Sequence, residues 1–305
     1  MTHNLLIRTL ITMTLILVLS GPAVAAETVT DAQGRTVTVD RPFTRIISLY
    51  SAHTENLVDL GACDSIIGAS RDEDRDKTKA CHRPVFFTQD GPEKFYAARP
   101  DLVLVRPMID RAYPGLIARL EQRGIRVLSF QPGDVNEMYD YWVTLGILTG
   151  KKDRALAMVR DFKQDLEKVK ARTKHLKQRK RVYFEAMHRQ MKTFSKDSMA
   201  IFCLEAAGGI NVAADAVSSR GTNIGIYGKE KILSKAGQID VFLVQNGRMN
   251  DADVATIRSE PGFQIIKAVK EGKIYRVNEN LVSRPTPRLI QGVTMIGKAL
   301  YPELF

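Results

Sequence analysis

The segment GPEKFYAARPDLVLV, residues 91–105, decides the fold, because it joins a short acid-headed helix pattern to an apolar strand pattern. The segment GKEKILSKAGQIDVFLV, residues 228–244, repeats this plan. Aliphatic and β-branched runs such as 102–105 and 241–244 are typical of strands buried in a parallel sheet. A repeat with a period far above 50 residues is not typical of a solenoid. The two segments therefore predict two α/β lobes of similar design with a cleft between them.

The first 25 residues have the pattern of a secretory signal peptide. An apolar run that includes residues 15–19 follows Arg8, and Ala23-Val24-Ala25 provides a small-x-small cleavage site. The run is too short to span a membrane with these flanks. No cysteine follows it, so we expect no lipid anchor. We therefore expect cleavage near Ala25 and an exported, soluble protein.

Composition and charge fit an ordinary globular chain of 305 residues, with 44% hydrophobic residues and a net charge of +11. Loss of residues 1–25 removes Arg8 and no acid, which lowers the charge from +11 to +10. The densest basic run, residues 168–181, lies on a predicted helix and is typical of a solvated face. A basic exported protein can attract anionic small molecules. No helix-turn-helix, RNP or zinc-finger pattern is present, so we predict no nucleic-acid partner.

Three cysteines remain in the exported chain: Cys63, Cys81 and Cys203. An oxidising compartment permits one disulfide, and Cys63 and Cys81 are the plausible pair. Closing that loop contributes roughly 3 kcal/mol where the geometry allows. Cys203 lies in an apolar helix pattern and is predicted to be a buried thiol.

Strand and helix patterns alternate along residues 26–135, which predicts an N-terminal α/β lobe with a parallel sheet. Strand patterns occur at 28–30, 36–39, 46–49, 65–68, 84–87, 102–105 and 125–128, and helix patterns at 53–60, 93–98 and 113–123.

Residues 136–178 form a predicted helical connector. Its second helix begins near Asp153 and has an apolar stripe without Gly or Pro, and some 23 residues make a rod of about 35 Å. Strand patterns resume at Val182, and residues 179–305 are predicted to form a C-terminal α/β lobe. The expected fold is α/β, with two Rossmann-like lobes of mainly parallel strands joined by a single long α-helix. Because the connector is stiff, we expect little closure on binding.

Candidate ligand-binding residues follow from the strand pattern, because open α/β sheets bind ligands beyond the carboxyl ends of their strands. Arginine beside aromatic groups suits a flat or bulky anion. The residues are Tyr50, Arg71 and Arg106 in the first lobe and His188, Arg189, Tyr227, Arg248 and Arg284 in the second.

Several of these segments together resemble a known family. They are residues 46–49 with Thr54-Glu55 and Leu60-Gly61, residues 99–103, residues 195–198 with 204–211, and residues 283–288. The chain resembles, over essentially its whole mature length, the bacterial periplasmic substrate-binding proteins of ABC importers for ferric siderophores, cobalamin and haem. The resemblance implies two lobes bridged by one long helix, a metal-chelate ligand, an ABC permease as partner, no cofactor and a monomer.

The resemblance also gives the repeat a function. In this family one glutamate on each lobe docks with arginines of the permease, and Glu93 and Glu230 fall at the matching positions. From the residues alone, a glutamate in the first turn of a helix favours the helix dipole by some 0.3–1 kcal/mol.

Several ligands and one enzyme remain as alternatives. A ferric siderophore is the first choice, a corrinoid or haem the second, and a small oxyanion the third. The mature chain has four histidines, too few suitably placed for a bare-metal site, although His53 or His188 could complete the coordination of a bound chelate. Two-lobed α/β folds of this kind also resemble tetrapyrrole metal chelatases, in which His and Glu side chains exchange metal and protons. In this chain Glu185 and His188 could take those roles. Nucleophile-elbow, Walker A, zinc-protease and dinucleotide motifs are absent from the sequence, and we expect no enzyme.

Overall fold

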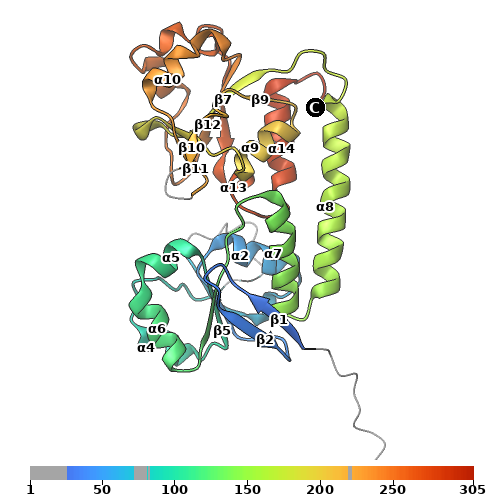
Figure 1. Cartoon of the computed structure of the whole chain (residues 1–305), viewed down its shortest axis with the longest axis vertical. Coiled ribbons are helices and arrows are strands. Elements are labelled where there is room, and N and C mark those ends of the chain that lie inside the picture. The colour runs from blue at the N-terminus through green and yellow to red at the C-terminus, as the bar shows by residue number, and fades with distance from the viewer. Residues whose placement is uncertain (1–25, 72–80, 82, 219–221) are drawn as a thin grey trace, which may run out of the picture.

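The computed structural model describes residues 26–71, 81, 83–218 and 222–305; the predicted signal peptide lies outside these residues. Two α/β lobes are joined by one long helix, α8 (Lys152–Thr173), which runs along one side of both (Figure 1). Its 22 residues span about 33 Å at 1.5 Å per residue. The predicted fold class and its long helix are confirmed.

The N-terminal lobe contains a hairpin and a parallel sheet of four strands. The hairpin pairs β1 (Glu27–Thr30) with β2 (Thr36–Val39), and the sheet has the order β4 (Ile66–Ala69), β3 (Ile46–Ser48), β5 (Leu102–Val105), β6 (Arg126–Ser129). The helices are α2 (Ser51–Asp59), α4 (Pro92–Ala98), α5 (Pro107–Ala112) and α6 (Pro114–Gln122). All of β5 is buried, as its unbroken apolar run predicts.

One local prediction in this lobe was wrong, and one helix was missed. The segment 84–87 is not a strand, because after a single bridge from Val85 to Ala69 the chain turns away. The amide of Phe87 donates to the Asp90 carboxylate at 2.8 Å, which closes this turn. Helix α5 was not predicted, although Pro107 at its first position is a common start signal.

The C-terminal lobe contains a mixed sheet of seven strands. Its order is β10 (Val217–Ser218), β11 (Ile224–Ile226), β8 (Lys192–Phe194), β7 (Arg181–Met187), β12 (Val241–Asn246), β13 (Ile274–Asn278), and β9 (Ile210–Asn211) also pairs with β7. The pairs β7–β12, β12–β13 and β7–β9 are parallel, whereas β8, β10 and β11 pair antiparallel. The α-helices are α9 (Met199–Ala206), α10 (Lys229–Ser234), α11 (Val254–Ser259), α12 (Lys267–Lys270), α13 (Glu279–Val282) and α14 (Leu289–Leu300).

The antiparallel strands depart from the simple βα series expected for this lobe. Only residues 188–191 separate β7 from β8, and this connection is too short for the helical crossover that parallel strands need. The sequence therefore folds back at this point.

One hydrophobic core continues from lobe to lobe through the connector. Trp142 of α7 (Val135–Leu148) contacts Phe162 of α8 with ring centroids 5.3 Å apart, and Phe162 stacks at 6.5 Å on Phe202 of α9. Close-packed interiors resist deformation, so this continuous core favours lobes that move little against each other. In the described part of the chain, no helix has the length and apolarity needed to cross a membrane.

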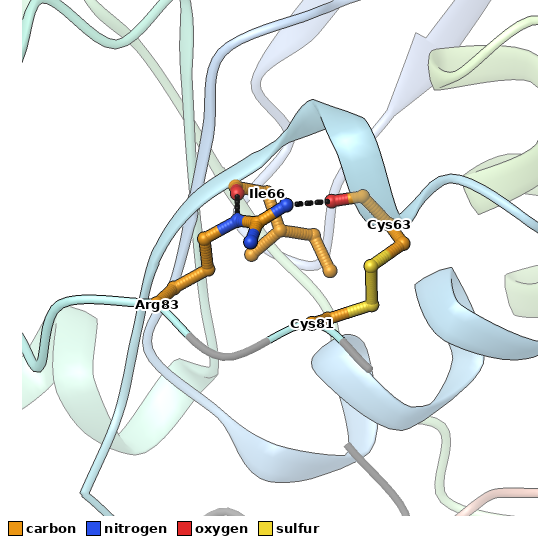
Figure 2. The surroundings of a disulfide bond; sticks show 4 residues. All are labelled: Cys63, Ile66, Cys81 and Arg83. Atoms are coloured by element: carbon orange, nitrogen blue, oxygen red, sulfur yellow. Dashed lines mark hydrogen bonds between the residues drawn. A yellow bond between two sulfur atoms is a disulfide. The ribbon is translucent and has the colours of Figure 1, made fainter. Parts of the chain in front are cut away.

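A disulfide joins Cys63 and Cys81, as predicted, with their Cα atoms 5.5 Å apart. Figure 2 shows Arg83 beside it, donating hydrogen bonds to the carbonyl oxygens of Ile66 and, at 3.2 Å, of Cys63. Cys203 is a buried free cysteine, and burial raises the pKa of its thiol. The cross-link and the arginine together fix the chain beside β4.

Removing the disulfide should destabilise the protein. We expect Cys63→Ser combined with Cys81→Ser to lower the free energy of unfolding by about 3 kcal/mol, because the unfolded chain regains the freedom of the open loop. Urea denaturation measures this loss, and a reductant should reproduce it in the wild type but not in the double variant. A loss below about 0.5 kcal/mol would contradict a structural role.

Candidate functional site

The carboxyl ends of the strands in the first lobe face the second lobe. Tyr50 follows β3 and precedes α2, and Arg106 follows β5 and precedes α5. Because β3 and β5 are parallel neighbours, their ends lie on one edge of the sheet. Helix α2 begins at that edge, and its Glu55 contacts Arg284 of the second lobe.

Three of the predicted ligand-binding residues come together at this edge. The guanidinium of Arg106 lies 4.9 Å from the centre of the Tyr50 ring, a cation–π arrangement. Burial raises the pKa of the Tyr50 phenol, whereas the positive charges of Arg106 and Arg284 act to lower it. A tyrosine and arginines from both lobes therefore lie close together between the lobes, with the carboxylates of Glu55 and Glu279 near them.

Arg284 also belongs to a buried contact between the lobes. It pairs with Glu55, whose side chain is fully buried, and Arg288 Nη1 lies 3.5 Å from the other oxygen of that carboxylate. The Pro285 carbonyl oxygen accepts hydrogen bonds from Asn56 Nδ2 and Trp142 Nε1, both at 3.0 Å. These contacts hold the loop before α14 against the first lobe, so Arg284 has a structural role that the sequence did not indicate.

His53 is part of the core and not of a ligand site. Its ring is fully buried, Nε2 donates to the Val105 carbonyl at 2.8 Å, and Nδ1 accepts from the Tyr141 hydroxyl at 2.6 Å. Burial, the largest effect, lowers the pKa of His53 to about 4, so the ring is neutral at pH 7. Both ring nitrogens are occupied, which corrects the expectation that His53 could coordinate a bound chelate.

His188 lies between two carboxylates in the second lobe. It begins the 3₁₀ turn η3 (His188–Gln190) at the end of β7, with Nδ1 3.1 Å from Glu185 and Nε2 3.3 Å from Glu260. Burial raises the pKa of Glu185, and the hydrogen bond with His188 opposes this effect. Where both acids are ionised they only accept hydrogen bonds, so contact with both then requires both ring nitrogens to carry protons. The hydrogen bond to Glu185 is the main cause that raises the pKa of His188.

The other predicted residues are spread over the loops. Arg189 is exposed and lies 3.6 Å from Asp251, Arg248 is exposed in the loop after β12, and Arg71 is exposed beyond β4. Asn250 joins two of these loops, because it accepts from the His188 amide at 3.1 Å and donates to the Gln245 carbonyl at 2.9 Å.

Tyr227 is placed differently from the other aromatic candidate. It is 6% exposed, its ring lies 5.8 Å from that of Tyr183 in the core, and its hydroxyl donates to Asp215 at 3.1 Å. The side chain is thus enclosed beside α10, away from Tyr50 and Arg106. A surface hollow of about 690 Å³ lies beside α11, and none of the predicted residues lines it.

Two carboxylates near the site were missed by sequence reasoning. Glu55 lies on α2, five positions after Tyr50, and is buried. Glu279 follows β13, accepts from the Met249 amide at 3.2 Å, and is close enough for its charge to act on Tyr50. Glu279 follows the carboxyl end of a strand, as the predicted arginines do, so its position was a usable signal.

The two repeated glutamates occupy equivalent places. Glu93 is exposed in the first turn of α4, and Glu230 is exposed in the first turn of α10. Figure 1 shows these helices in different lobes, both on the side of the molecule away from α8.

Comparisons with known proteins agree with this architecture. Residues 46–281 match the family model described as periplasmic binding protein. An uncharacterized ABC transporter substrate-binding lipoprotein of Bacillus subtilis is 27% identical over 91% of this chain and 86% of its own length. A vitamin B12-binding protein of Vibrio vulnificus is 23% identical over 84% of this chain and 89% of its own. The structure of an Fe³⁺-hydroxamate transport system protein from Saccharomonospora viridis superposes with a TM-score of 0.70 at 25% identity, covering 90% of this chain and 99% of that one. The chain belongs to the periplasmic binding protein family, whose members are the substrate-binding components of ABC transport.

Proposed function

We propose that the protein captures a metal chelate between its lobes and delivers it to an ABC permease. The observation that carries this proposal is the group of Tyr50, Arg106 and Arg284, which joins an aromatic face to cationic groups from both lobes. Arginine offers bidentate hydrogen bonds and stacking to flat or bulky anionic groups. A ferric siderophore is the first choice on this chemistry.

A corrinoid is the second choice. It is favoured by the relatives named for vitamin B12 or cobalamin and by the mixture of arginine and tyrosine at the site. A haem would use similar contacts, and a small oxyanion would use the arginines alone.

Coloured chelates test capture directly. The mature chain is incubated with a ferric hydroxamate, cyanocobalamin or haemin, passed through a sizing column, and the bound colour is measured per chain. The expected result is one of these chelates bound at one per chain, released unchanged on unfolding. Repeated insertion of cobalt or iron into a free tetrapyrrole would instead establish the chelatase alternative.

Arg106 should contribute to affinity. We expect Arg106→Ala to weaken binding of the captured chelate about tenfold, because the site loses a charged group and a cation–π contact. Arg123→Ala is the matched control, since the Arg123 guanidinium lies 5.2 Å from the Tyr96 ring in the same lobe, remote from Tyr50. Equal losses in the two variants would remove Arg106 from the site.

Export and docking complete the proposal. Residues 1–25 would direct export and be cleaved near Ala25, and the Cys63–Cys81 disulfide suits an oxidising compartment. Glu93 and Glu230 would each meet an arginine of the permease, one glutamate from each lobe.

A further inference from the structure

A chain of charged side chains runs from the core of the second lobe to the helix that carries Glu230. Glu185, in the middle of β7, contacts His188, which contacts Glu260, and Glu260 pairs with Lys229. The exposed fraction of the side chain rises along this series, from 0% for Glu185 through 9% for His188 and 19% for Glu260 to 35% for Lys229. Lys229 immediately precedes Glu230 and is the first residue of α10.

Helix α10 needs such anchors, because it has only six residues and no side-chain cap at its start. Helices this short are not stable on their own in water and depend on tertiary contacts. Asp215 pairs with Lys231, the third residue of the helix, at 3.3 Å and with Lys235, just beyond the helix, at 2.7 Å. Glu260 supplies the corresponding charged anchor at the end that carries Glu230.

We propose that His188 and Glu260 position Glu230: protonated His188 holds Glu260, and Glu260 holds Lys229 at the start of α10. The effect on transport rests on the proposed docking role of Glu230, whereas the anchor itself can be measured on the isolated protein.

The charged groups that face His188 come from two directions. Glu185 approaches from β7 and Glu260 from the segment after α11, and Lys229 of α10 acts through Glu260. The loop after β12 contributes Asn250, and η5 (Phe263–Ile265) contributes the Phe263 ring, 6.2 Å from the imidazole. Among these groups His188 contacts two acidic side chains and no cation directly, and their negative charge favours the doubly protonated ring.

The anchor should respond to pH in a fixed direction. The pKa of His188 is raised, so its stabilising contacts are complete below the ordinary pKa of about 6.5 and are lost as the pH rises through the folded-state value. A neutral ring can donate to only one of the two carboxylates. Alkaline pH should therefore release the start of α10.

Hydrogen exchange of the full mature protein tests the proposal. We expect protection of α10 amides, corrected for intrinsic exchange rates, to fall about tenfold between pH 6 and pH 9, the effect of losing one charge-assisted hydrogen bond. His188→Gln and Glu260→Gln should show the low value already at pH 6, with no further fall. Helix α4, which carries Glu93 and lacks this chain of charges, is the internal control.

A measurement on the wild type avoids any variant that fails to fold. Nitrogen NMR shifts of the His188 ring should show both nitrogens protonated at pH 7. A neutral ring at pH 7, or equal α10 protection at pH 6 and pH 9, would overturn the proposal. If the anchor is found but variants of Glu230 transport normally, the anchor stands and the docking role of Glu230 fails.

Discussion

Reversing the charge of both repeated glutamates should abolish transport. In Glu93→Lys combined with Glu230→Lys, we expect no uptake above background in cells that carry only this variant, while the affinity for the captured chelate is unchanged. Both side chains are exposed on helices that lie on the side away from α8. In the variant a positive charge in each lobe would therefore face the proposed permease arginines. Like-charge contacts at an interface cost several kcal/mol.

The control changes the net charge equally at another surface. Asp161→Lys with Glu167→Lys alters two exposed acids of α8, on the opposite side of the molecule, and should transport normally. A purely structural role of the glutamates predicts a loss of stability of about 0.3–1 kcal/mol with transport retained. Weakened chelate binding in the Glu93 and Glu230 variant would also contradict the assignment.

Removing the Glu55 carboxylate should strongly destabilise the protein. We expect Glu55→Ala to lower the free energy of unfolding by about 3–5 kcal/mol, because Arg284 and Arg288, with side chains only 13% and 17% exposed, lose their shared carboxylate. Urea denaturation measures this loss. Because this contact joins the lobes, its loss should also loosen the loop before α14.

Trp142 offers a second readout of this contact. It is the only tryptophan, is fully buried, and donates to the Pro285 carbonyl beside Arg284. In Glu55→Ala its emission should shift to longer wavelength as water reaches the indole. Glu167→Ala is the control, because its carboxylate is 73% exposed beside Lys170 and such surface pairs contribute about 0–1 kcal/mol. A Glu55 variant as stable as this control, with unchanged emission, would show that the contact does not hold the lobes.

Much of the fold could be predicted because its signals are local. Four consecutive aliphatic residues predicted β5, and the corresponding run predicted most of β12. The uninterrupted stripe of α8 predicted one stiff connector, and the family resemblance agreed with it. The rule that parallel strands end at one edge placed Tyr50 and Arg106 together, as the structure does.

The remaining features depend on contacts that no local pattern encodes. Glu55 and Arg284 are 229 positions apart, and their pairing follows only from the placement of one lobe on the other. His53 follows β3 as Tyr50 does, but helix α2 turns its ring inward to Tyr141. Tyr227 follows β11, whose antiparallel pairing with β8 was not expected, and the strand-end rule does not apply to such a strand.

Ligand-dependent unfolding of the wild-type mature protein tests the central claim most directly. A ferric hydroxamate, cyanocobalamin, haemin and molybdate are each titrated while thermal unfolding is followed. We predict that one metal chelate raises the stability by about 2.7 kcal/mol at 100 times its dissociation constant, with the effect reaching saturation at one ligand per chain. Stabilisation by molybdate alone, or by none of the three chelates, would contradict a chelate receptor.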